Sequence, residues 1–74
     1  MEKGWSKIKT YLNPIEAEIV RLMLVENGIP AVILNKQDSS YHFGKIELFV
    51  HDDNVDEAVK MIDESENVGE DNVN

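Results

Sequence analysis

The 74-residue sequence predicts an α+β fold whose strands and helices follow the order β-α-β-β-α. Two observations support this order. A strand followed by a capped helix occurs twice, over 5–28 and over 45–66, and an apolar run over 30–35 supplies a further strand between them. A chain this short forms one domain and buries only about 60% of its unfolded surface. We therefore expect a single domain over 1–66, followed by a disordered acidic tail over 67–74.

The first strand is predicted over Trp5–Leu12, where apolar and polar residues alternate with a period of two. Such alternation is typical of a strand that turns one face toward a core. It assigns one face to Ile8, Thr10 and Leu12. It assigns the opposite face to Trp5, Lys7, Lys9 and Tyr11.

The first helix is predicted to begin at Asn13 and Pro14. An asparagine side chain can accept a hydrogen bond from an unpaired N–H of the first turn, and proline suits the first helical position because it has no N–H to leave unpaired. The 3.6-residue period that follows predicts a buried stripe formed by Ile15, Ile19, Leu22 and Met23. Gly28 marks the helix end, since glycine adopts the left-handed conformation there without a Cβ penalty.

Two more strands are expected on either side of a polar loop. The run Pro30–Leu34 is continuously apolar, which favours a strand covered on both faces. The loop over 35–44 then leads to an alternating strand over Lys45–His51. One face of that strand carries Ile46, Leu48 and Val50, and the other carries Lys45, Glu47, Phe49 and His51.

The second helix is predicted to be capped by Asp52 or Asp53 and to run to Glu66. Its expected buried stripe comprises Val55, Ala58, Val59 and Ile62. The formal net charge of −8 lies entirely in residues 52–74, which hold nine acidic side chains and one lysine, whereas residues 1–51 are neutral. This acidic third of the chain opposes binding to phosphate backbones.

These elements assemble into a ferredoxin-like plan that lacks its last strand, with a three-stranded antiparallel sheet in the order 1-3-2. Both helices are expected to cover the sheet face that bears Ile8, Leu12, Ile46, Leu48 and Val50. No helix remains for the other face. Because monomers seldom expose large apolar patches, we expect a partner to bind that open face or an unpaired strand edge.

The residue pattern predicts no catalytic residue, no metal site and no cofactor. There is no cysteine, which excludes disulfides and thiolate ligands, and the four glycines are too dispersed for a phosphate-binding loop. Ser39 and Ser40 lack the nucleophile-elbow pattern. We interpret His42 as a solvated loop residue and His51 as a strand end beside capping aspartates; a general-base or metal-binding role for either is the less favoured alternative.

Nucleic-acid and membrane functions are also disfavoured. An RNA-recognition domain shares this topology, and Trp5, Tyr11 and Phe49 could mimic its stacking platform. However, Lys45–His51 does not match the signature of that domain, and the acidic charge opposes RNA. No apolar stretch approaches the roughly 18–20 residues that span a bilayer, and no signal core follows the first residues. We expect a cytosolic protein.

Several segments carry a family resemblance, namely 13–18, 24–31, 47–50 and 56–58, together with Gly44 and Ile62. Over about Trp5–Glu64 the chain resembles a small bacterial family labelled "putative prokaryotic signal transducing protein". The resemblance implies a ferredoxin-like, PII-like fold and a ligand-sensing or protein-binding role. The short loop 35–44, the single arginine and the missing fourth strand depart from PII proteins, so no ATP site is carried over.

The sequence as a whole predicts a non-enzymatic interaction or signalling module that binds a protein partner, or a second copy of itself as a homo-oligomer. The expected partner-binding residues are Trp5, Lys7, Lys9, Tyr11, Phe49 and His51. The alternative is a small-ligand sensor of PII-like type that uses the loop over 35–44.

Overall fold

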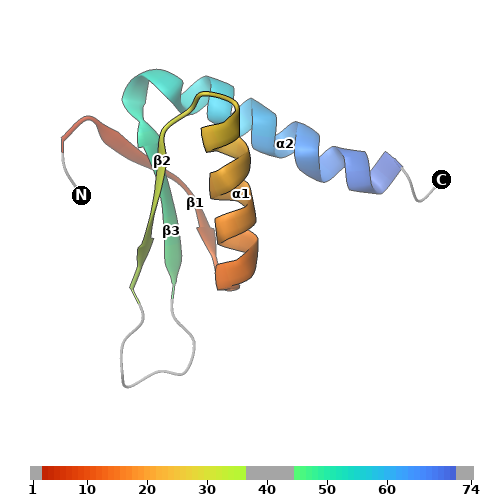
Figure 1. Cartoon of the computed structure of the whole chain (residues 1–74), viewed down its shortest axis with the longest axis horizontal. Coiled ribbons are helices and arrows are strands. Elements are labelled where there is room, and N and C mark those ends of the chain that lie inside the picture. Colours follow the sequence, from red (N-terminus) through yellow and green to blue (C-terminus); the bar gives the residue numbers. More distant parts are fainter. Residues whose placement is uncertain (1–2, 37–44, 72–74) are drawn as a thin grey trace.

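The computed structural model describes residues 3–36 and 45–71, with side chains described as far as residue 66. Figure 1 shows a short sheet with two helices beside it. The elements in chain order are β1 (Trp5–Tyr11), α1 (Pro14–Glu26), β2 (Ala31–Asn35), β3 (Ile46–His51), the 3-10 turn η1 (Asp52–Asn54) and α2 (Val55–Asp71). The sheet has the order β1-β3-β2, and both outer strands pair antiparallel with β3. The predicted fold class and strand order are confirmed.

Both ends of α1 follow the sequence signals. The Asn13 side chain accepts hydrogen bonds from the backbone N–H groups of Ile15 at 2.8 Å and Glu16 at 3.4 Å. At the other end Gly28 has a φ of 83°, and the N–H of Ile29 donates to the carbonyl of Leu24 at 2.9 Å. This six-residue closure satisfies a carbonyl that the helix end would otherwise leave unpaired.

The core lies between the two helices and one face of the sheet. Its fully enclosed centre consists of Leu48 and Val50 from β3 together with Leu24 and Ile29 from the α1–β2 region. Each helix also presents an alanine with no exposed surface, Ala17 in α1 and Ala58 in α2, and a small side chain lets the helix backbone approach the sheet closely. The remaining members of this core are Tyr11, Ala31, Ile46 and Ile62.

A β-bulge in β1 changes which side chains face the helices. Lys7 lies opposite Phe49, and Lys9 lies opposite Leu48, the residue directly beside Phe49 in β3. Ile8 therefore has no partner in the register. An extra residue reverses the inward and outward alternation beyond the bulge. Lys9 and Tyr11 therefore share the helix-covered face with the core residues of β3, and Tyr11 is only 3% exposed.

The orientations predicted for four residues in and directly after β1 are wrong. Lys9 and Tyr11 were expected on the open face of the sheet and lie on the helix-covered face instead. Thr10 was expected on the buried face but is exposed opposite Glu47, and Leu12 lies just beyond β1 with 73% of its surface exposed. Simple alternation failed because it assumes a regular strand, and nothing in the local residue pattern marks the extra residue.

The inner side of α1 also differs from the predicted stripe. The α1 residues that pack into or against the core are Ala17, Val20, Met23 and Leu24. Ile15, Ile19 and Leu22 are 70%, 62% and 47% exposed. The prediction that these three residues are buried is wrong, because α1 turns its other apolar side toward the sheet.

The second helix begins later and continues further than the sequence predicts. Asp52 starts η1, and its carboxylate accepts a hydrogen bond from the Ser6 hydroxyl. Ala58 and Ile62 are buried as expected, but Val59 is 46% exposed. In Figure 1 α2 extends past the sheet, and it reaches Asp71 within the segment predicted to be a tail; residues 72–74 lie outside the described part.

Candidate interaction surfaces

We call the sheet face opposite the helices the reverse face. The strand registers place eight residues on it: Trp5, Lys7, Thr10, Val32, Leu34, Glu47, Phe49 and His51. Four of the six predicted partner-binding residues, Trp5, Lys7, Phe49 and His51, therefore lie together. Lys9 and Tyr11 do not join them, because the bulge turns them to the other face.

Phe49 forms the floor of the reverse face. It occupies the central strand between Lys7 on β1 and Val32 on β2, and it is only 8% exposed. Cross-strand neighbours stand about 5 Å apart, so the side chains on the outer strands can cover a central ring. Phe49 thus stabilises the sheet from a position that a partner can scarcely reach.

Glu47 carries a buried carboxylate on the same strand. Glu47 is 7% exposed. Its Oε2 lies 3.2 Å from Lys7 Nζ, and its Oε1 lies 3.5 Å from Lys36 Nζ. The hydrogen bond from Lys7, together with the positive charge of Lys36, lowers the pKa of Glu47. Lys7 belongs to β1 and Lys36 directly follows β2, so this ion-pair cluster links the central strand to both sides of the sheet.

Trp5 is the half-buried aromatic residue of the reverse face. Its ring lies 4.0 Å from the His51 ring between centroids, at an interplanar angle of 30°. Beside it is an open groove of about 430 Å³, lined by Trp5, Val25, Gly28, Pro30, Ala31 and Val32. No ionisable side chain lines this groove, which therefore suits an apolar occupant.

The two outer strands protect their edges differently. β1 contains the bulge and two lysines, features that discourage another strand from pairing. β2 pairs with β3 in an unbroken register and has no bulge. The groove beside Trp5 includes Pro30, Ala31 and Val32, so it reaches the start of β2, whose outer edge pairs with no strand among the described residues.

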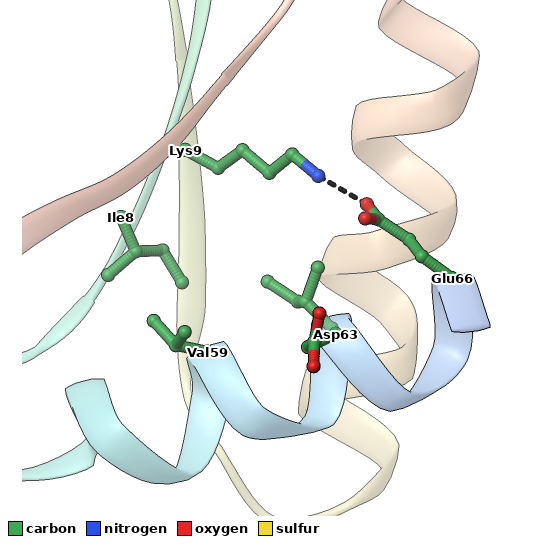
Figure 2. A pocket seen from close by; sticks show the side chains of 6 residues that line it. Ile8, Lys9, Val59, Asp63 and Glu66 are labelled. Carbon is green, nitrogen blue, oxygen red and sulfur yellow. Dashed lines mark hydrogen bonds and ion pairs between the residues drawn. The ribbon is translucent and has the colours of Figure 1, made fainter.

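A smaller groove lies on the other side of the molecule, between β1 and α2. It measures about 150 Å³, and Figure 2 shows Ile8 and Val59 on its walls. Lys9 spans it to form an ion pair with Glu66, and this hydrogen bond raises the pKa of Lys9. The lysine also lies 5.3 Å from the centre of the Tyr11 ring, so it joins β1 to α2 rather than facing solvent as a free cation.

The most exposed apolar surface lies on the outside of α1. We call these exposed aliphatic residues the outer stripe; they are Ile15, Ile19 and Leu22 of α1, together with Leu12, which precedes its N-cap residue. The sequence periodicity marked three of them, but it assigned them to the core. A usable signal was present, because α1 is apolar on both sides: Ala17 and Leu24 form a second stripe opposite the first.

Other expectations fall outside these surfaces. His42 and most of the loop proposed for ligand sensing lie in residues 37–44, which are outside the described part of the chain. Within residues 3–36 and 45–71, no three histidine or acidic side chains come together as a metal site would require. In the same ranges no helix combines the length and apolar character needed to traverse a membrane.

Comparison with known families gives one match. The family model described as "Putative prokaryotic signal transducing protein", a family of unknown function, matches residues 5–66. This range includes all three strands, α1 and most of the described length of α2. No curated protein and no solved structure matches the chain.

Proposed function

The chain belongs to the family of putative prokaryotic signal transducing proteins, and on that basis we propose that it is a non-enzymatic, cytosolic interaction module that binds a partner protein within a signalling pathway. The site that best supports this function is the groove beside Trp5 at the open β2 edge. We propose that an extended segment of the partner lies along this edge and places an apolar side chain in the groove.

The lining of the groove is the observation that carries this proposal. All six of its residues are apolar or glycine, and the indole of Trp5 forms one wall. A polar metabolite needs a few converging polar or charged side chains for its recognition, and this lining provides none. An apolar side chain on a protein segment needs only a matching apolar surface, and tryptophan is enriched among residues that dominate such interfaces.

The open edge supports an extended partner segment. A strand added to a sheet edge gains backbone hydrogen bonds, while alternate side chains supply specificity. β2 offers an unbroken outer edge, and Val32 on its reverse face is 37% exposed. Lys7 and His51 flank Trp5 on the same face, so we expect them to make secondary contacts with the partner.

The experiment starts with affinity capture on the tagged full chain in a lysate of its host, followed by purification of the captured protein and calorimetric titration. Trp5→Ala should weaken binding by about tenfold or more, the effect of losing a buried tryptophan anchor. Thr10→Ala, also exposed on the reverse face, is the matched control and should bind like the unmodified chain.

Two results would contradict the proposal. One is a Trp5→Ala variant that binds the purified partner with unchanged affinity. The other is a thermal-shift screen in which a small metabolite raises the melting temperature while no protein is captured, since this result favours the ligand-sensor alternative.

A further inference from the structure

The outer stripe is separate from the Trp5 groove and lacks any cover among the described residues. Leu12 is 73% exposed, Ile15 is 70% exposed and Ile19 is 62% exposed. Ile15, Ile19 and Leu22 are spaced i, i+4 and i+7, so they form a line along α1. At 3.6 residues per turn this line is opposite the side that holds Ala17 and Leu24.

A helix that is apolar on two opposite sides is typical of an element enclosed between two layers. The sheet supplies one layer for α1, and the described chain supplies no second one. We propose that a second copy of this chain supplies it, with the two α1 helices packed antiparallel about a two-fold axis. In such an interface the same surface serves both copies, so it must be complementary to itself.

The apolar residues meet this requirement. If the axis passes between Ile19 and Val20, residues whose numbers total 39 lie at the same level along the two helix axes. Leu22 of one copy is then level with position 17 of the other. At that level it fits between the side chains of Ile15 and Ile19 of the other copy. The reciprocal contact follows from the symmetry, and the branched side chains of the two stripes interdigitate along the seam.

The ion pair on the flank of α1 does not obstruct an antiparallel pair. Arg21 Nη2 lies 2.6 Å from Glu18 Oε2 within a single helix, and both side chains are partly exposed. At 3.6 residues per turn, Glu18 lies about 70° and Arg21 about 130° around the helix from the stripe. Both charges are therefore paired within each copy, and neither has to be buried between the two stripes.

Glu26 distinguishes antiparallel from parallel packing. It continues the line of the outer stripe at the C-terminal end of α1. Parallel packing would place the two Glu26 carboxylates next to each other, whereas antiparallel packing places each beside Asn13 and Pro14 of the other copy. That position is the N-terminus of a helix, where the macrodipole favours negative charge.

The net charge predicts how salt affects this dimer. The excess of eight negative charges lies in residues 52–74, which follow α1 in the chain, and it makes two copies repel each other at long range. Salt screens this repulsion and strengthens burial of apolar surface. Dimerisation should therefore become stronger between low and moderate ionic strength, whereas an interface held mainly by ion pairs would weaken.

Sedimentation equilibrium over a series of protein concentrations tests the interface. The unmodified chain should dimerise, and Ile19→Glu should raise the dissociation constant by about tenfold or more, since it places a carboxylate at the centre of the seam. Val32→Glu introduces the same charge at an exposed position of the reverse face and should leave the dimer unchanged. A monomeric unmodified chain at every concentration, or a dimer lost with Val32→Glu and retained with Ile19→Glu, overturns the proposal.

Cysteine cross-linking tests the geometry independently, because the chain has no cysteine of its own. In the antiparallel dimer Ile19→Cys lies beside the axis and should form a disulfide between copies on mild oxidation. Ile15→Cys should not, because two copies of position 15 lie about 13 Å apart along the seam, beyond disulfide reach. Cross-linking of both variants indicates parallel packing and overturns the antiparallel arrangement, and cross-linking of neither excludes this seam.

The two experiments separate this inference from the proposed function. Trp5→Ala should leave the sedimentation behaviour unchanged, and Ile19→Glu should leave the affinity for the captured partner unchanged. Failure at the outer stripe therefore does not remove the Trp5 groove, and failure at the groove does not remove the outer stripe.

Discussion

The reverse face of the sheet and the outer stripe of α1 both lie without a covering layer in the described chain, but they treat their apolar residues differently. On the sheet, Phe49 is 8% exposed although no helix lies over it. On the helix, Ile15 and Ile19 are 70% and 62% exposed. A central strand has neighbours on both sides that can lean over its side chains, whereas the outer line of a helix has none. An exposed helix stripe therefore indicates a missing partner more strongly than an open sheet face does.

The largest expected effect separates the floor of the reverse face from the outer stripe. Phe49→Ala should lower the free energy of unfolding by about 3–5 kcal/mol, because it leaves a cavity under the outer strands. Ile19→Ala should leave that free energy unchanged within about 0.5 kcal/mol, since its side chain is mostly exposed. Chemical denaturation of both variants, at a concentration where the chain is monomeric, provides the measurement. Similar losses in both variants would show that the stripe is buried within one chain.

A second comparison uses two leucines of α1. Leu24 has no exposed surface and Leu22 is 47% exposed, so Leu24→Ala and Leu22→Ala remove the same atoms from opposite environments. We expect Leu24→Ala to lose about 2–4 kcal/mol of stability and Leu22→Ala to lose less than about 1 kcal/mol in the monomer. Thermal unfolding followed by circular dichroism measures both variants. An equal loss would mean that α1 packs with a different side toward the sheet.

The smallest expected effect concerns pH and the ion-pair cluster of the reverse face. The pKa of Glu47 is lower in the folded chain than its ordinary value, chiefly because Lys7 donates a hydrogen bond to it. The unfolded state therefore binds more protons in acid, so the stabilisation is present above the unfolded pKa near 4.5 and is lost as the pH falls through the folded pKa.

Glu47→Gln should make the free energy of unfolding less dependent on pH below about 5. Glu18→Gln is the matched control, because the pKa of Glu18 is also lowered, by the hydrogen bond from Arg21, but within one turn of a helix and with both side chains partly exposed. A partly exposed helical pair contributes little, so this variant should follow the unmodified chain closely. Denaturant titrations between pH 3 and 7 make the comparison, and identical curves for Glu47→Gln and the unmodified chain would contradict the role of the cluster.

The candidate surfaces could be predicted from the sequence only in part. Trp5, Lys7, Phe49 and His51 were correctly grouped on one sheet face, because the alternation of β3 and of the first residues of β1 is regular. The placement of Tyr11 failed, since one extra residue in β1 reverses every later position. The groove beside Trp5 could not be predicted, because Val25, Pro30 and Trp5 meet only when the end of α1 lies next to the end of the sheet.

The outer stripe shows a different limit. Its spacing was visible in the sequence, but α1 has two apolar sides and the period alone does not say which side faces the sheet. The larger side chains of Ile15 and Ile19 suggested the core, whereas the structure places Ala17 there with no exposed surface. A small residue allows the helix backbone to approach the strands, and the gain in close packing outweighs the size of any single side chain.

By itself the sequence determined the order of the elements, the strand order of the sheet and both ends of α1. Each of these depends on short-range chemistry, such as the Asn13 side chain beside the first helical N–H groups and Gly28 in a conformation that other residues avoid. Only the tertiary structure decided where β1 bulges, which side of α1 is buried and which residues remain exposed for a partner. Those outcomes depend on how whole elements pack together, and the energies involved are shared among residues that lie far apart in the chain.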